Sequence, residues 1–280
     1  FAQWQPDVRL SDFPISSRVT PRVGKNIATN GSVVHAVWDD ARHGTEREIY
    51  YKRSTDDGIN WGADTRLTND PASSQLSTLA VSGEVVYVMW YDLRNGAGEI
   101  YNKLSTDAGL TWGDDIRLTD NAGVSGHPSV TVSGQIVHVV WEDETIGNYK
   151  IYYKRSTDGG VSWETDTRLT NDPSGSSNCS VNVSGQVVHV FWNDDRDGNF
   201  EIYYKRSTDG GANWGTDIRL TNDSDVSNYP SVTSSGSIVH VVWEDYRDGS
   251  EIYYKRSTDG GLNWDEDTRL TNAGSFSMYP

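Results

Sequence analysis

The octapeptide STDGGVSW, residues 156–163, decides the fold because close relatives of it recur along the chain. The other copies are STDDGINW (54–61), STDAGLTW (105–112), STDGGANW (207–214) and STDGGLNW (257–264). Their first serines are 51, 51, 51 and 50 residues apart. Such regular spacing is typical of a structural unit copied in tandem. The sequence therefore predicts five repeats.

Each repeat shows the pattern of four β-strands. In the fourth copy, β-branched and aromatic runs separated by turn residues lie at 180–183, 187–192, 201–207 and 217–221. No helical periodicity occurs, and the second and third runs are apolar on both faces, as in strands buried between layers. Four-stranded units that need a neighbour on each side close into a β-propeller. We expect an all-β propeller of five blades, each with four antiparallel strands; a six-bladed ring with one incomplete blade is the alternative.

The chain reads as a single domain over residues 1–280. Residues 27–272 hold the five repeats. Residues 1–26 are expected to form an extra outer strand and a long connector, because WQPDVRLSD (4–12) resembles the blade tail WGADTRLTND (61–70). Residues 273–280 are expected to be the stub of a further repeat, because SMYP repeats SNYP (227–230).

The octapeptide itself is interpreted as a hairpin staple. Its glycine gives a cheap positive φ, its Ser and Asp accept backbone N–H groups across the turn, and its Trp is buried between blades. The residues with this expected structural role are Ser54, Asp56, Gly58, Trp61, Ser105, Asp107, Gly109, Trp112, Ser156, Asp158, Gly160, Trp163, Ser207, Asp209, Gly211, Trp214, Ser257, Asp259, Gly261 and Trp264.

The motif Ser-x-Asp-x-Gly-x-x-Trp resembles the Asp-box, or BNR repeat, of sialidases and related propellers, and it covers all five repeats. The resemblance implies a propeller whose Asp-boxes lie on the face opposite an active site. Sialidases also carry Arg-Ile-Pro before the first strand and an acidic-x-Arg after the second. Here SRVTPRV (17–23) holds Arg18, Pro21 and Arg22, and DDAR holds Asp40 and Arg42. The match departs from the family, since RVTP replaces Arg-Ile-Pro and Asp-x-Arg occurs in four blades. Two further arginines and a Tyr–Glu pair implied by the family have no assignable position.

Composition restricts the partners. The chain carries 24 Lys and Arg against 40 Asp and Glu, a net charge of −16, without a basic cluster, so a nucleic acid partner is not expected. No apolar run approaches the roughly 18 to 20 residues that cross a bilayer, so membrane insertion is not expected either. The single Cys179 allows no internal disulfide and no zinc pattern. An acidic chain poor in thiols, with Ala-Gln near its start, favours a secreted or cell-surface protein of bacterial type.

Positions shared by the blades are interpreted as structural. Strand-two histidines, replaced by Tyr87 in blade two, are expected to be hydrogen-bonded within their blades: His35, His138, His189 and His240. Every strand two ends in Trp-x-Asp, at Asp40, Asp92, Asp143, Asp194 and Asp245. Four blades add an Arg (Arg42, Arg94, Arg196, Arg247) and a Glu (Glu48, Glu99, Glu201, Glu251), which we expect to form cross-hairpin ion pairs. Blade three has Thr145 and Lys150 instead, with Lys150 expected to turn to Asp143 or Glu144.

A calcium site in the loop NDDRDG (193–198) is disfavoured. Position twelve is Tyr204, where an EF-hand needs a bidentate Glu. We expect no metal and no organic cofactor.

The repeats disagree in the connector between one blade's last strand and the next blade's first. One variable position holds Gly24, Leu76, His127, Asn178 and Tyr229, followed by Lys25, Ser77, Pro128, Cys179 and Pro230. The first connector is five residues longer and adds Arg18, Arg22 and Lys25. We hypothesise a site for a small polar or anionic ligand, such as a glycan, with the cations as contacts and Tyr229 and His127 as walls. The alternative is drift in exposed loops.

Glycoside cleavage needs two acids, or a Tyr–Glu pair, around one pocket, whereas the acids here repeat by blade. The sequence therefore favours a non-catalytic extracellular propeller that binds a glycan or a protein. Two alternatives stay open: a sialidase-like exo-glycoside hydrolase, and a structural module of a larger surface protein.

Overall fold

The computed structural model describes residues 9–11, 17–18, 25–144, 147–272 and 276–280, with only the backbone described at 17–18. Within these ranges the chain contains strands and turns and no helix, so no membrane-spanning helix is found there. Five separate antiparallel sheets follow one another along the chain. This arrangement confirms the all-β propeller and its five blades.

Blade 1 is β2 (Ile27–Asn30), β3 (Val33–Asp40), β4 (Glu48–Ser54) and β5 (Thr65–Arg66), with β1 (Ser17–Arg18) also paired to β3. Blade 2 is β6 (Ser74–Ser82), β7 (Val85–Asp92), β8 (Glu99–Ser105) and β9 (Ile116–Arg117). Blade 3 is β10 (Ser125–Ser133), β11 (Ile136–Asp143), β12 (Lys150–Ser156) and β13 (Thr167–Arg168). Blade 4 is β14 (Ser176–Ser184), β15 (Val187–Asp194), β16 (Glu201–Ser207) and β17 (Ile218–Arg219). Blade 5 is β18 (Ser227–Ser235), β19 (Ile238–Asp245), β20 (Glu251–Ser257) and β21 (Thr268–Arg269).

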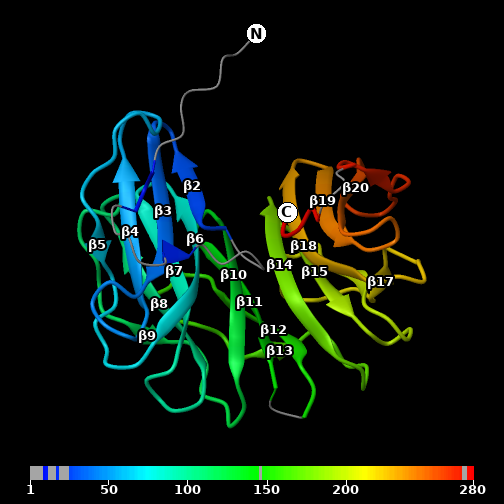
Figure 1. Ribbon diagram of the computed structural model, residues 1–280, viewed down its shortest axis with the longest axis horizontal. Helices are drawn as coiled ribbons and strands as arrows, with labels where there is room; N and C mark the ends of the chain where they lie inside the picture. Colours follow the sequence, from blue (N-terminus) through cyan, green and yellow to red (C-terminus); the bar gives the residue numbers. More distant parts are fainter. Residues whose placement is uncertain (1–8, 12–16, 19–24, 145–146, 273–275) are drawn as a thin grey trace.

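The blades are arranged in sequence order around a common centre, toward which their first strands lie (Figure 1). The first strands β6, β10, β14 and β18 each contact the next, and the C-terminal residues lie near the same centre. Each outermost strand contains only two residues, shorter than the sequence predicts.

The apolar core lies between neighbouring blades. Between blades 3 and 4, for example, Val140 and Tyr153 pack against Val181, Val188 and the fully buried Cys179. Complete burial raises the pKa of the Cys179 thiol, which disfavours the reactive thiolate. Strands that are apolar on both faces are thus explained by burial against a blade on either side.

The Asp-box hydrogen bonds follow the expected pattern. In blade 3 the Ser156 hydroxyl accepts the N–H of Gly160 at 2.8 Å and donates to Asp158 at 2.7 Å, and Asp158 accepts the N–H of Ser162 at 2.8 Å. The box tryptophan lies against the preceding blade: the Trp214 ring meets the edge of Tyr153 with centroids 4.8 Å apart. The box therefore fastens its own hairpin and also contacts the neighbouring blade.

Each strand-two histidine forms a hydrogen bond with a tyrosine of strand three in its own blade, as predicted. The Nδ1–Oη distances are 2.6 Å for His35–Tyr51, 2.7 Å for His138–Tyr153, 2.8 Å for His189–Tyr204 and 2.6 Å for His240–Tyr254. Burial, and next a nearby arginine, lower the pKa of His35, His138 and His189 to about 4. These three imidazoles are therefore neutral parts of the fold at neutral pH.

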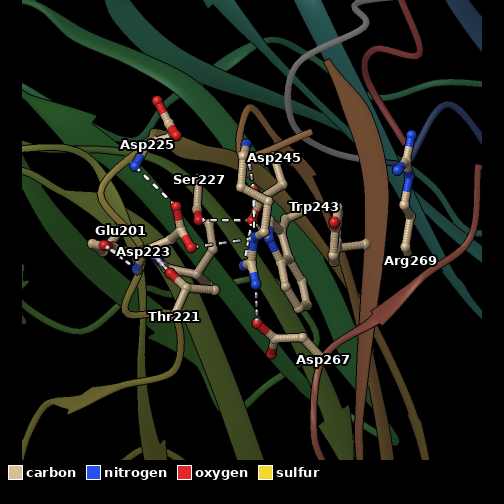
Figure 2. Close-up of polar contacts among 12 residues, drawn as sticks. Glu201, Thr221, Asp223, Asp225, Ser227, Trp243, Asp245, Asp267 and Arg269 are labelled. Carbon is tan, nitrogen blue, oxygen red and sulfur yellow. Dashed lines mark hydrogen bonds and ion pairs between the residues drawn. The ribbon is translucent and has the colours of Figure 1, made fainter. Parts of the chain in front are cut away.

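The predicted Arg–Glu ion pairs are wrong. In blade 5, Arg247 instead binds Asp245 at 2.6 Å and Asp267 at 2.9 Å. Asp245 also accepts Ser227 and Trp243, which Figure 2 shows converging on it. The side chain of Asp245 is fully buried, so its charge needs these partners.

The glutamates pair with strand-four arginines instead. Glu251 binds Arg269 at 2.8 Å, and the corresponding pairs are Glu48–Arg66, Glu99–Arg117 and Glu201–Arg219. In blade 3, Lys150 donates to the backbone carbonyls of Asp172 and Ser174 rather than turning to Asp143 or Glu144. Thr145 lies outside the described residues.

The two ends of the described chain occupy positions that belong to a blade pattern. Lys52 donates to the carbonyl of Leu10 at 2.8 Å, as Lys255 donates to that of Leu220 in the preceding blade. Ser277 N–H donates to the carbonyl of Ser250 at 2.8 Å, as Ser227 does to that of residue 200. Residue 10 thus has the position of a last strand and residue 277 that of a first strand.

Candidate functional site

The propeller has two chemically different faces. Asp-box loops lie beside the turns that join the first and second strands, as the Gly210 N–H to Gln186 carbonyl bond of 2.9 Å shows. At the opposite end, the start of each first strand pairs with the end of the second, for example Ser176 with Asp194. The Trp-x-Asp ends and the connectors therefore share one face, here called the Trp-x-Asp face.

The variable positions predicted to lie in connector loops lie instead within first strands. A register shift interrupts each strand there, and the residue at the shift has positive φ: Leu76 (58°), His127 (50°), Asn178 (53°) and Tyr229 (55°). Tyr279, at the matching place after blade 5, has φ 57°. We call these five residues the bulge row. Non-glycine residues held in this conformation cost about 1 kcal/mol or more each and cluster at functional sites.

The cations of the first connector are only partly described. Arg22 and Gly24 lie outside the described residues, as does the side chain of Arg18, whose backbone pairs with Asp39. Lys25 is exposed, and its backbone bonds to blade 2 through Leu79 and Thr78. Their role in binding stays a prediction.

A second set of residues on this face escaped the sequence analysis, namely the middle residues of Trp-x-Asp. They are Asp39, Tyr91, Glu142, Asn193 and Glu244. Those of blades 2 to 5 lie opposite the residue that precedes a bulge, as Glu142 lies opposite Gly126 and Glu244 opposite Asn228, whereas Asp39 pairs with Arg18. The signal was present in the sequence, because this position varies between two invariant ones. Only the sheet register shows that it adjoins the bulge row.

The middle residues of blades 1 and 3 have basic or amide partners. Asp39 binds Arg47 at 2.5 Å. Glu142 accepts the N–H of Asn178 at 2.9 Å and contacts Nδ1 of His127 at 2.5 Å. Both oxygens of Glu142 are therefore engaged by bulge-row residues of its own and the next blade.

Blade 5 differs. The Glu244 carboxylate is fully buried, and it accepts a hydrogen bond from the Ser250 hydroxyl at 2.8 Å. Burial, and then the adjoining Glu244 carboxylate, raise the pKa of Tyr246 to about 12. The bulge-row rings of Tyr229 and Tyr279 lie 5.1 Å apart and tilted by 58°. An aromatic group thus covers a buried negative charge near the centre of the face.

Comparison with known proteins assigns the family. The family described as BNR repeat-like domain matches residues 2–241. This chain belongs to the BNR repeat-like domain family. A sialidase from Paraclostridium sordellii is 26% identical over 255 residues, which is 79% of this chain and 59% of that protein. The chain therefore spans 59% of the length of this curated relative.

Solved structures share the fold of this BNR propeller. Hadza microbial sialidase Hz136 is similar with a TM-score of 0.62 at 15% identity, over 92% of this chain and 59% of that one. An alpha-L-arabinanase from Penicillium chrysogenum, solved with arabinobiose, is similar with a TM-score of 0.64 at 14% identity, over 90% of this chain and 82% of that one. At such identities the likeness shows the fold alone.

Two open hollows occur beside blade 1 of the BNR propeller: one of about 360 Å³ on blade 1 and its outgoing connector, and one of about 270 Å³ between blades 1 and 2. The arginines that line them are already paired, Arg66 with Glu48 and Arg94 with Asp115. Among the described residues no three His, Cys, Asp or Glu side chains gather so that they could hold a metal ion. The bulge row and the middle residues are therefore the stronger candidate site.

Proposed function

We propose that this BNR propeller binds carbohydrate on the Trp-x-Asp face, at the bulge row and the middle residues beside it. The observation that carries the proposal is the change of side chain at these positions in blades whose scaffold otherwise repeats. A symmetric scaffold with different side chains at one ring of positions gives each blade its own contact with a ligand.

The chemistry of these positions suits sugars. Tyrosines present an apolar ring face together with a polar hydroxyl, and carboxylates and amides accept hydrogen bonds from hydroxyl groups. The bulge row supplies Tyr229, Tyr279, His127 and Asn178, all partly exposed. The middle residues behind it hold them in place through contacts such as Glu142–Asn178.

A second candidate is hydrolysis of a sialoside, supported by the 26% identical sialidase. Binding an anionic sugar carboxylate calls for arginine or lysine side chains. Arg42, Arg94, Arg196 and Arg247 on this face are held by buried aspartates. The described residues thus favour binding over sialoside hydrolysis. Replacing Arg22 by Ala would test whether the first connector contacts a sugar carboxylate.

A glycan array followed by titration calorimetry on the best glycan tests the proposal. Replacing Tyr229 by Ala should lower the affinity for that glycan about tenfold or more, because the ring contributes contact area on the surface. The melting temperature should stay within about 2 °C. Val161→Ala, in an exposed Asp-box loop on the other face, is the matched control.

Unchanged affinity in Tyr229→Ala would place the ligand elsewhere on the molecule. A panel of fluorogenic glycosides, sialosides included, separates binding from hydrolysis. Turnover of a sialoside that Tyr229→Ala abolishes would replace the binding proposal by the hydrolase.

A further inference from the structure

We propose that Tyr229, Tyr246 and Tyr279, above the buried carboxylate of Glu244, form a cup that binds an organic ammonium group. The cup itself does not depend on the proposed function. Under that function, on which the identity of the ammonium-bearing molecule rests, the ammonium group belongs to an amino sugar of the bound glycan.

Comparison of blades 1 and 5 shows that, among the described residues, Glu244 lacks the cationic partner that Asp39 has. Asp39 and Glu244 are equivalent middle residues, and Arg47 and Ser250 are the equivalent residues that precede strand three. Arg47 neutralises Asp39 at 2.5 Å, whereas Ser250 gives Glu244 only a hydroxyl. Glu244 takes part in no ion pair with a described lysine, arginine or histidine. Its partners among the described residues are hydroxyl groups, that of Ser250 at 2.8 Å and that of Tyr246 beside it.

Comparison of blades 3 and 5 shows what stands in place of the usual partners. In blade 3 the two flanking bulge-row residues, His127 and Asn178, satisfy both oxygens of Glu142. In blade 5 the corresponding residues are Tyr229 and Tyr279. Their side chains offer ring faces, which attract cations, where blade 3 offers N–H groups.

The geometry of the rings suits an ammonium ion. Tyr229 and Tyr279 are 5.1 Å apart and tilted rather than stacked, so their faces form two sides of a cup. Tyr246 belongs to the same cluster, because it follows Glu244 by two residues and its N–H donates to the carbonyl of Val226, three residues before Tyr229, at 3.0 Å; it is 41% exposed. A ligand therefore reaches the rings from solvent.

Electrostatics give the cup its preference for positive charge. A poorly solvated carboxylate whose described partners are only hydroxyl groups is costly, and a cation a few ångströms away offsets that cost even without direct contact. A cation on desolvated rings gains about tenfold or more in affinity over a neutral group of the same shape. Glu244 and the three rings act on the same ligand.

The first experiment compares choline with 3,3-dimethylbutan-1-ol, its neutral isostere, by following tyrosine ring signals in NMR titrations of the full chain. We expect choline to bind about tenfold or more tightly than the isostere. In Glu244→Gln and in Tyr246→Ala this preference should fall to within about twofold. Tyr149→Ala, an exposed tyrosine of blade 3 outside the cup, should keep it.

A variant that adds a cationic partner for Glu244 keeps the test valid if the variants that remove side chains misfold. Ser250→Arg places at blade 5 the cation that blade 1 carries, so it should abolish choline binding while the melting temperature stays equal or rises. The position already holds Gly98, Tyr149 and Phe200 in other blades, which shows that it tolerates large changes.

The second experiment titrates a glucosamine tetrasaccharide and its N-acetylated counterpart under the same conditions. Equal binding of choline and its isostere overturns the cup, whatever the glycans do. Choline preference without binding of any glycan keeps the cup and overturns the carbohydrate proposal. Tighter binding of the N-acetylated tetrasaccharide keeps carbohydrate binding but overturns the amino sugar as the carrier.

Discussion

At the scale of single residues, the Asp-box glycine is needed for two separate reasons in three of the blades. Gly211 has φ 84°, and a Cβ there would lie 1.9 Å from the Tyr153 hydroxyl of the preceding blade. The same contact occurs at Gly109 with Tyr51 and at Gly261 with Tyr204. The glycine is therefore required both by the turn and by the ring of the neighbouring blade.

Replacing Gly211 by Ala should lower the free energy of unfolding by about 3 kcal/mol or more, because strain in φ adds to a steric clash. Gly185→Ala is the control: its φ is 61° and no atom lies within 4 Å of the added Cβ. The control should lose only about 1 to 2 kcal/mol. Equal losses of unfolding free energy in the two variants, measured by urea denaturation, would show that the contact with Tyr153 does not contribute to stability.

At the scale of the strand and its loop, blades 1, 2, 4 and 5 keep a buried ionic cluster at the end of strand two. In blade 4, Arg196 binds Asp194 at 2.7 Å and Asp217 at 2.9 Å, and its guanidinium lies 4.4 Å from the Tyr203 ring centroid. Hydrogen bonds to Asp194 and Asp217 keep Arg196 charged by raising its pKa. Both oxygens that a calcium ion would need from Asp194 are thus engaged by the chain itself.

Arg196→Ala should destabilise the protein by about 3 kcal/mol, because Asp194 keeps a buried charge without its partner. Arg256→Ala breaks an exposed pair with Asp265 and should cost less than about 1 kcal/mol. Chemical denaturation of both variants measures the difference. A cost for Arg196→Ala no greater than for Arg256→Ala would contradict the importance of burial.

The histidine–tyrosine pairs predict a loss of stability in acid. Because the folded pKa of about 4 lies below the unfolded value of 6.5, the unfolded chain binds more protons between these values. Each such histidine contributes stability that is complete above pH 6.5 and is lost, by about 1.4 kcal/mol per pH unit, as the pH falls toward 4.

Blade 2 provides the substitution to test this, because it has Tyr87 and Asn102 where blade 3 has His138 and Tyr153. The double variant His138→Tyr/Tyr153→Asn should make the dependence of unfolding free energy on pH shallower by about 1.4 kcal/mol per unit in that window. An unchanged slope would mean that His138 is already protonated in the folded chain.

At the scale of the whole molecule, the blades of the described chain are not equally covered. Leu270 of blade 5 is 55% exposed, whereas its equivalents Leu67, Leu118, Leu169 and Leu220 are 8% exposed or less. At the other end, Ile27 is 56% exposed and its equivalent Leu79 is fully buried. The free energy of opening a blade depends on the apolar area it buries against its neighbours.

Native-state hydrogen exchange of this 280-residue chain should therefore show faster exchange for β19 and β20 than for β15 and β16. We expect protection factors lower by about tenfold or more, since an uncovered face removes on the order of 1 to 2 kcal/mol from local opening. The two blades share nearly the same sequence, which makes blade 4 an internal reference. Equal protection in both would mean that the array opens only as a unit.

The sequence by itself determined the architecture. The signals were local or periodic: a repeated octapeptide, turn residues, and strands apolar on both faces. Strand order, the blade count and the histidine positions could therefore be read from the repeats that STDGGVSW and its copies mark. It did not determine which charges meet. Arg247 pairs with Asp245 and Asp267, whereas the equally buried Glu251 is paired by Arg269 of strand four, an arrangement that only the packed sheet brings about. Likewise Tyr229, Tyr279 and Glu244 are separated along the chain and meet only through sheet register and the contact between blades. The scaffold follows from local patterns, whereas the candidate site depends on which side chains the packing of neighbouring β-sheets brings together.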